Sequence, residues 1–171
     1  MVRILIFGDT HQAKRVQKRM FRRYADSYDF IVCTGDIEEF KPPKQMFLCP
    51  GNHDIDMFGE AMFRLMDGHE KIDNLTVIKA GRVYTHMGLR IAGLPGNYAE
   101  TDFDVPRGKL KYQRHFTRNE FEACLNLRGV DIFVSHEAPL GVADLSWRDR
   151  RTHCGVWPAR KLLDTLAPRY Y

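Results

Sequence analysis

The sequence predicts an α/β protein, and three observations support this prediction. Short apolar runs that end in a polar glycine turn are typical of buried strands. Between the first two runs, apolar residues recur at helical spacing, and strand, helix and strand form a βαβ unit with parallel strands. Beyond residue 73, short strands with glycine-marked turns leave little room for helices, which predicts a hairpin or meander. The three apolar runs cover residues 2–7, 29–34 and 46–50.

The first helix is expected between residues 12 and 27, with one apolar face and a strongly basic remainder. The expected apolar face consists of Ala13, Val16, Met20 and Tyr24. The cations on the rest of the circumference are Lys14, Arg15, Lys18, Arg19, Arg22 and Arg23. A second helix is expected around residues 56–66.

The second half of the chain is expected to combine short strands with helices. The polar stretch 97–118 is too long for a routine connection and is expected to be a lid or a substrate loop. Thr117 has the position of an N-cap, and Glu120 completes a capping box for a helix over residues 118–127. The other expected elements are strands at 74–81, 82–88, 89–96 and 130–141, a helix at 156–166 that Pro168 ends, and the start of a strand at 169–171.

Length and composition are those of a globular protein of one domain. The chain has 171 residues, of which 44% are hydrophobic and 28% are charged, as is ordinary for a soluble protein. The formal net charge of +4 suits an anionic substrate but is far below that of a dedicated nucleic-acid binder. Without a signal peptide or a spanning segment, the protein is expected in the cytoplasm. The cysteines lack CxxC spacing and are expected to be reduced thiols: Cys33, Cys49, Cys124 and Cys154.

Polar residues cluster in the turns that follow the predicted strands. In an open α/β sheet such turns meet at the carboxyl edge, where ligands bind. Carboxylates and imidazoles without thiolates suit divalent manganese, iron, zinc, cobalt or nickel. Asp36 lies in the central turn, so its carboxylate is the natural bridge between two ions. The whole set comprises Asp9, His11, Asp36, Asn52, His53, Asp54 and His136.

This set of residues predicts phosphoester hydrolysis. Two ions about 3.5 to 4 Å apart would make a bound water acidic enough to be hydroxide near neutral pH, and would hold a phosphoryl group for in-line attack. His53 would be free to donate a proton to the leaving oxygen, with Asp54 holding it and keeping it basic. Each turn alone is weak evidence, since His136 could be a structural histidine. The conjunction of the turns in this order supports the prediction.

The same turns resemble the sequence blocks of the calcineurin-like metallophosphoesterases. The family pattern reads D-x-H, G-D, G-N-H-[DE] and then a single histidine after a strand, and residues 5–140 resemble it. The resemblance implies an α/β/β/α sandwich of two mixed β-sheets flanked by helices, with two divalent ions, manganese favoured over iron, zinc, nickel or cobalt. It also implies these roles: Asp9 and His11 bind one metal, Asn52 and His136 bind the other, Asp36 bridges, and His53 with Asp54 assists at the leaving group.

The family's fifth block, G-H-x-H, has no counterpart in residues 1–171. One explanation is a single metallophosphoesterase domain, shortened at its C-terminus, that remains an enzyme. The alternative is a catalytically impaired interaction scaffold that resembles the retromer subunit of this fold. The enzyme is favoured because His53 and Asp54 are both present. The remaining histidines are assigned to surface, substrate or turn positions, with His153 a minor candidate ligand: His69, His86, His115 and His153.

The expected substrate is a phosphodiester, nucleotide-derived or a nucleic acid, with a phosphomonoester as second choice and no membrane partner. Residues 109–118 interleave cations with aromatic rings and could hold a nucleic acid by phosphate contacts and stacking. An ordered lid that packs these rings inward is an equal alternative. The arginines of residues 15–23 are expected to form a solvated face. A further patch could contact substrate or a partner chain: Trp147, Arg148 and Arg150.

Overall fold

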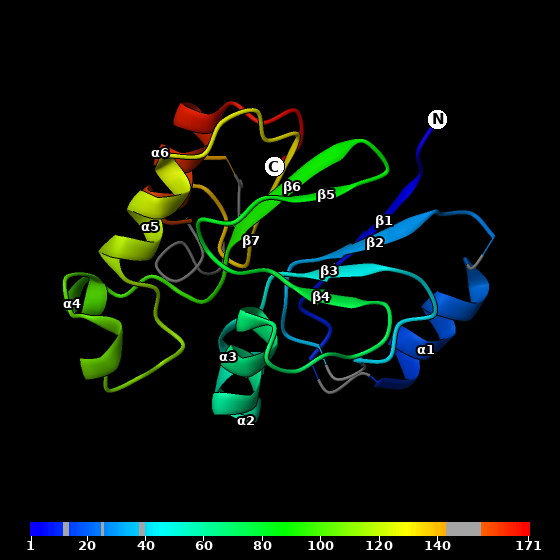
Figure 1. Cartoon of the computed structure of the whole chain (residues 1–171), viewed down its shortest axis with the longest axis horizontal. Coiled ribbons are helices and arrows are strands. Elements are labelled where there is room, and N and C mark those ends of the chain that lie inside the picture. The colour runs from blue at the N-terminus through cyan, green and yellow to red at the C-terminus, as the bar shows by residue number, and fades with distance from the viewer. Residues whose placement is uncertain (12–13, 25, 38–39, 143–154) are drawn as a thin grey trace.

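The structure, a computed structural model, describes residues 1–11, 14–24, 26–37, 40–142 and 155–171. Its strands form two sheets (Figure 1). The first sheet contains β1 (Ile4–Phe7), β2 (Phe30–Cys33), β3 (Met46–Leu48) and β4 (Leu75–Val77), all parallel. The second contains β5 (Tyr84–His86), β6 (Leu89–Leu94) and β7 (Ile132–Ser135), with β5 antiparallel and β7 parallel to β6.

The predicted α/β class and the two flanked sheets are confirmed, with one correction of detail. The resemblance implied two mixed sheets, but over the described residues the first sheet is wholly parallel, because each strand is reached by a crossover connection. Of the expected hairpin or meander after residue 73, the structure contains a hairpin that includes two of the three strands. β4 follows helical structure and therefore returns parallel to β3, and only β5 and β6 form a hairpin.

Apolar side chains bind the layers together. Successive residues of a strand face opposite sides of the sheet, so Ile31 and Cys33 of β2 face the helices while Phe30 and Val32 face the second sheet. The second sheet likewise packs on helices through Phe133 of β7. In Figure 1, α1 (Lys14–Arg23), α2 (Asn52–Phe58) and α3 (Glu60–Asp67) lie beside the first sheet, and α5 (Arg118–Leu125) and α6 (Trp157–Leu166) lie beside the second.

The structure corrects the predicted apolar face of α1. Gln17 and Phe21 are buried, and Met20 packs partly against the same core. Phe21 meets Phe7 of β1 edge-on, with 5.5 Å between the ring centroids. An aromatic ring buries more apolar surface than a valine side chain, so Phe21 decides which face turns inward. Of the four residues of the predicted face, Val16 and Tyr24 are exposed, Met20 packs partly inward, and Ala13 lies outside the described residues.

The second helix begins earlier than predicted and is divided in two. α2 begins at Asn52, so the polar turn after β3 is itself the first turn of a helix. Gly59 separates α2 from α3 with a positive φ of 50°, a conformation that glycine adopts without steric cost. The side chains of residues 52–54 are therefore held by helical backbone rather than by a loop.

The long polar stretch is ordered and packs inward. It contains α4 (Glu100–Phe103) and the 3-10 helix η1 (Arg107–Lys109). Phe103 and Phe116 are buried, whereas Tyr112 is exposed. Of the two rings in residues 109–118, only Phe116 therefore packs inward as the ordered-lid alternative expects. The predicted capping box of α5 is confirmed, because the Thr117 hydroxyl accepts from the backbone N–H of Glu120 and the Glu120 side chain accepts from that of Thr117. The predicted strand start is reduced to one bridge, between Tyr170 and Ile132.

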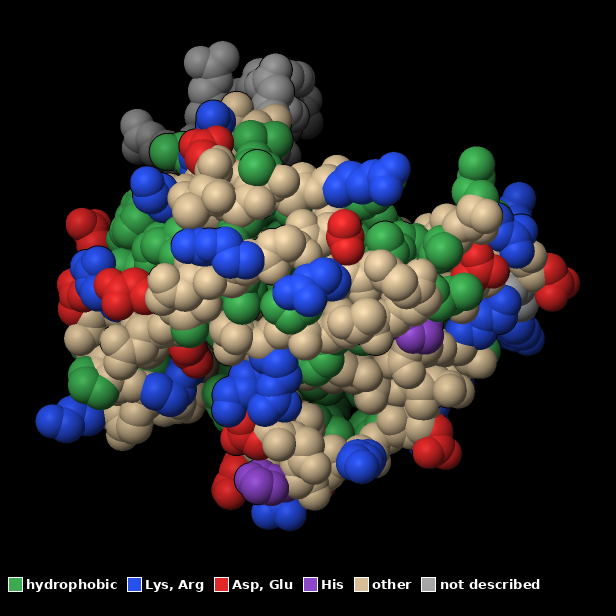
Figure 2. Space-filling model, turned by 45° about the horizontal axis from the view of Figure 1, so that its top comes forward, with side chains coloured by type: hydrophobic (Ala, Val, Ile, Leu, Met, Phe, Trp, Pro, Cys, Tyr) green, Lys and Arg blue, Asp and Glu red, His purple; other side chains and the backbone are tan. Residues whose placement is uncertain are grey.

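Among the described helices, none is long and apolar enough to cross a membrane. Acidic and basic side chains are mixed over the face shown in Figure 2. Three cysteines are free and buried, as expected for reduced thiols: Cys33, Cys49 and Cys124. Cys154 and the predicted patch of Trp147, Arg148 and Arg150 lie outside the described residues.

Candidate metal centre

Four loops meet in one open cleft of about 600 Å³. They follow β1, β2, β3 and β7 at the carboxyl ends of the strands, where an open α/β sheet places its ligands. Six of the predicted site residues line the cleft: Asp9, His11, Asp36, Asn52, His53 and His136. The sequence blocks, far apart along the chain, therefore converge as expected.

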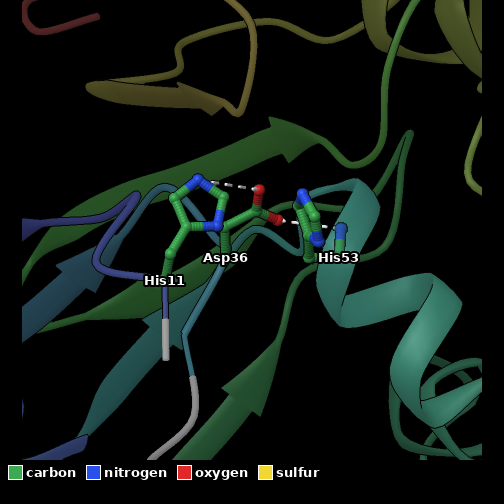
Figure 3. Close-up of side chains that lie close together, drawn as sticks. All are labelled: His11, Asp36 and His53. Atoms are coloured by element: carbon green, nitrogen blue, oxygen red, sulfur yellow. Dashed lines mark hydrogen bonds and ion pairs between the residues drawn. The ribbon is translucent and has the colours of Figure 1, made fainter. Parts of the chain in front are cut away.

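Asp36 is the central residue of the cleft, and its side chain is only 2% exposed. Its Oδ1 accepts the backbone N–H of His53 at 3.0 Å. Its Oδ2 lies 3.4 Å from Nε2 of His136 and 4.0 Å from Nε2 of His11. Figure 3 shows His11 and His53 on either side of this carboxylate. One buried carboxylate thus faces nitrogen donors on more than one side.

The first group of donors lies around His11. Its Nε2 is 2.7 Å from Oδ1 of Asp9, and its ring meets that of His53 edge-on, with centroids 4.8 Å apart. One ligand atom each from His11, Asp36 and His53 lies within 4.8 Å of the others, a spacing that could hold a metal ion. His53 therefore lies close enough to His11 and Asp36 to contact a group bound between them.

The second group consists of Asn52 and His136. Nε2 of His136 lies 3.2 Å from Oδ1 of Asn52, and its Nδ1 lies 2.8 Å from the carbonyl oxygen of Thr34. A carbonyl can only accept, so Nδ1 carries the proton in this contact and Nε2 is directed at Asp36 and Asn52. A backbone partner behind the ring is the usual device that orients a metal-binding histidine.

The loops carry an unusual backbone conformation at the same place. Asp9, His11 and Asp36 have positive φ values of 55°, 26° and 54°, which cost about 1–3 kcal/mol each at residues other than glycine. Two hydrogen bonds clamp the first loop to the second, from the N–H of Asp9 to the carbonyl of Gly35 (2.8 Å) and from that of His11 to the carbonyl of Asp36 (3.2 Å). Such strain is concentrated at functional sites.

Gly51 is required by close approach. A Cβ at this position would lie 2.6 Å from Cε1 and 2.7 Å from Nδ1 of His136, and closer still to Oδ1 of Asp36. Ordinary contacts of a Cβ begin at 3.4 Å. The absence of a side chain at Gly51 therefore lets the backbone of α2 come up against both Asp36 and His136.

Asp54 does not take the predicted place behind His53. Its buried carboxylate accepts three backbone N–H groups, from Asp36 (2.7 Å), Gly51 (2.9 Å) and Ile37 (2.9 Å). Burial raises the pKa of Asp54, and these three hydrogen bonds oppose the rise. The carboxylate ties the loop after β2 to the start of α2, so it positions Asp36 rather than the imidazole of His53.

Asp36 and His136 stabilise each other's charged forms. Burial raises the pKa of Asp36, but His136 and the backbone N–H of His53 outweigh burial and hold this pKa below its ordinary value. Burial lowers the pKa of His136, but Asp36 and the Thr34 carbonyl outweigh it and raise this pKa. A metal ion requires a neutral histidine ligand, so it competes with the proton on His136.

The donors present fit a pair of divalent ions. Carboxylate oxygens come from Asp9 and Asp36, an amide oxygen from Asn52, and imidazole nitrogens from His11 and His136. This mixture of oxygen and nitrogen ligands without thiolate suits manganese, iron, zinc, cobalt or nickel. Among the residues that the structure describes, Asp36 is the carboxylate that reaches both groups of donors.

Two residues of the cleft were missed by the sequence analysis. Asn97 lines the cleft, and its side-chain Oδ1 is buried without a hydrogen-bond partner. Glu137 also lines it and accepts the backbone N–H of Tyr98 at 2.8 Å. Burial raises the pKa of Glu137, which that hydrogen bond opposes. A signal for Asn97 existed, because Pro-Gly-Asn follows β6 as it follows β3, and the N–H of Gly96 donates to the carbonyl of Pro50.

Of the other histidines that the structure describes, none lines the cleft. His86 packs against Phe30 and Phe47 between the sheets, with ring centroids 5.0 and 5.5 Å away. His115 pairs through Nδ1 with Asp102 at 2.6 Å. His69 is exposed, as expected, and His153 lies outside the described residues.

Comparison with known proteins identifies the family. The family model of the calcineurin-like phosphoesterases matches residues 2–170, so the chain belongs to this family. It is accordingly a phosphoesterase domain of the metal-dependent type, a hydrolase whose substrates are phosphoesters. A search of curated proteins returned no match.

Proposed function

We propose that the chain hydrolyses a phosphodiester with two divalent metal ions, manganese favoured, bound in the cleft. Asp9 and His11 would hold one ion and Asn52 and His136 the other. The observation that carries the proposal is the position of Asp36, whose Oδ2 lies 4.0 Å from Nε2 of His11 and 3.4 Å from Nε2 of His136. When bound, such ions lower the pKa of a coordinated water and neutralise charge on the phosphoryl oxygens.

The residues of the chain supply orientation and a proton. His53 is held by the hydrogen bond from its backbone to Asp36, with its imidazole at the cleft. Attack of water on phosphorus breaks the bond to the leaving alcohol, and the imidazole of His53 would give that oxygen a proton. The proton released by the attacking water passes to solvent, from which the imidazole regains its own. A side chain positioned for proton transfer contributes typically about 10²- to 10⁴-fold to the rate.

Asn97 is proposed to contact the substrate. Its side-chain amide lines the cleft and has an unpartnered oxygen, and a buried polar atom of this kind calls for a partner. A hydroxyl group or a bound water of the substrate complex would satisfy it. The openness of the site favours a diester, because the second ester group needs room beyond the reacting phosphorus.

Hydrolysis of bis-p-nitrophenyl phosphate with and without Mn²⁺ tests the proposal, with p-nitrophenyl phosphate as the monoester comparison. We expect Mn²⁺-dependent turnover that is faster on the diester. Asp36→Asn should lower kcat/KM by about 10³-fold or more, equal to about 4 kcal/mol. The matched control is Asp73→Asn, an exposed carboxylate away from the cleft. Equal turnover by Asp36→Asn and the control would refute the mechanism, and a folded but inactive wild type would favour an interaction scaffold.

A cytoplasmic location is also proposed. The support is chemical, because Cys33, Cys49 and Cys124 are free thiols in the folded protein, and free thiols persist in a reducing compartment.

A further inference from the structure

We propose that the outer face of α1 binds the phosphate backbone of single-stranded nucleic acid and leads it to the cleft. This surface, the α1 arginine face, consists of Arg15, Arg19, Arg22 and Arg23. The inference rests on the proposed function only where it names nucleic acid as the substrate. The binding surface itself stands on the arrangement of the arginines.

The four arginines share one side of the helix. With 3.6 residues per turn, their positions fall within an arc of about 100°. Gln17 and Phe21, the buried residues of α1, fall on the opposite side. All four arginines are exposed. The face spans about 12 Å along the helix axis from Arg15 to Arg23.

The charge of this face is not neutralised within the described part of the chain. α1 contains no acidic residue, and no described carboxylate pairs with any of the four arginines. Two of the arginines contact groups that carry no charge. Nε of Arg22 donates to the carbonyl of Lys18 at 3.3 Å, and Cζ of Arg23 lies over the ring of Tyr24, 5.6 Å from its centroid. Figure 2 shows basic side chains, with a few acidic ones, at the end of the molecule where Figure 1 places α1.

The stretch 109–118, which the sequence offered as a nucleic-acid surface, is a poorer candidate. Its two arginines are paired with carboxylates, Arg114 with Asp56 and Arg118 with Asp104. Of its two rings Phe116 is buried and cannot stack on a base, whereas Tyr112 is exposed, with Cζ of Arg114 4.7 Å from its ring centroid. The structure therefore reverses the expected order of the two basic segments.

The side chain type and the location favour a phosphodiester chain as the partner. The planar fork of arginine matches phosphate oxygens in a bidentate manner. Arg15 follows His11 by four residues, so it lies within about 14 Å of that cleft residue. An anionic membrane is disfavoured, because Phe21 and Met20 pack into the core and α1 has no continuous apolar face to enter a bilayer.

Fluorescence anisotropy with a labelled 12-nucleotide oligo-dT, in EDTA, tests the surface without hydrolysis. We expect the logarithm of the binding constant to fall linearly with the logarithm of the salt concentration. The slope should be near −3, because each of four contacted phosphates contributes about −0.7. Between 50 and 200 mM salt this slope weakens binding about 50-fold. The variant with Arg15, Arg19, Arg22 and Arg23 all changed to Gln should bind about tenfold or more weakly at 50 mM salt, with a slope close to zero.

A charge-matched control separates a docking surface from the effect of net charge. Changing four exposed lysines elsewhere to Gln lowers the net charge equally and should leave most of the binding intact: Lys71, Lys109, Lys111 and Lys161. Thermal melts of both variants check that each is folded. Equal loss in the two variants, or binding to phosphatidylserine vesicles in place of the oligonucleotide, would overturn the proposal. Because the assay contains no metal, a failure here is distinct from a failure of the proposed catalysis.

Discussion

Replacement of Gly51 by alanine tests the close packing on which the metal centre depends. The added Cβ would lie 2.6 and 2.7 Å from the ring of His136 and nearer still to Oδ1 of Asp36, where ordinary contact begins at 3.4 Å. Asp36 and His136 must therefore retreat by roughly 1 Å, a strain of the kind that costs about 1–3 kcal/mol in packed sites.

Asp36 and His136 cannot move away from Gly51 without weakening hydrogen bonds. Oδ1 of Asp36 accepts the N–H of His53, and Nδ1 of His136 contacts the Thr34 carbonyl, so moving these atoms away from Gly51 disturbs both hydrogen bonds. For a chain of this length, 1–3 kcal/mol lowers Tm by about 2–12 °C. A displacement near 1 Å at catalytic groups can cost about 10²-fold in rate.

Thermal unfolding and Mn²⁺-dependent diester hydrolysis measure both effects. The matched control is Gly108→Ala, because a Cβ at Gly108 meets no atom within 4 Å. We expect Gly51→Ala to melt lower than this control and to lose about 10²-fold in kcat. A Tm and a kcat equal to those of Gly108→Ala would refute the argument that this glycine is needed for close approach.

Three further predictions follow from the other contacts of the site. Asp54→Asn should reduce the free energy of unfolding, measured by urea titration, by about 2–4 kcal/mol relative to Asp73→Asn, because it disturbs three buried hydrogen bonds to backbone amides. A loss of kcat without a loss of stability would instead support the predicted role of Asp54 as the partner of His53. Asn97→Ala should raise KM about tenfold with little change in kcat, whereas Asn119→Ala, on exposed α5, should not, and an unchanged KM would remove Asn97 from substrate binding. In the metal-free protein, the pKa of His136 is higher in the folded state than in the unfolded state, so its protonation stabilises the fold at low pH, and this stabilisation is lost as the pH rises through the pKa of the folded state. The Tm of the wild type should therefore fall more between pH 6 and pH 8.5 than the Tm of His136→Gln. Parallel curves of Tm against pH would contradict this prediction.

Much of the site was predictable because its signals are local. A polar residue directly after a buried strand lies at the carboxyl edge of a parallel sheet, so Asp36 and Asn52 could be placed together from the order of the strands. His136 follows β7 of the second sheet, so its place beside them depended on how the two sheets pack. The capping box at Thr117 is likewise a matter of neighbours along the chain.

The rest depended on contacts between distant segments. From the sequence, Asp54 is predicted to be a partner of its neighbour His53. In the structure its carboxylate accepts the backbone N–H groups of Asp36 and Ile37, which only folding brings close to it. Asn97 became part of the cleft because its turn hydrogen-bonds to the turn after β3. β4 joined the first sheet because the helices before it return the chain parallel to β3.

The sequence by itself determined the order of strands and the chemistry at their ends, because backbone periodicity and turn residues act over a few positions. Tertiary structure alone decided which charged side chains form ion pairs and which do not. Arg114 and Arg118 form ion pairs with carboxylates from other segments, whereas no described carboxylate pairs with the arginines of α1. Pairing of charges depends on distance in space, and the core, by burying Phe21, turned the arginines of α1 outward.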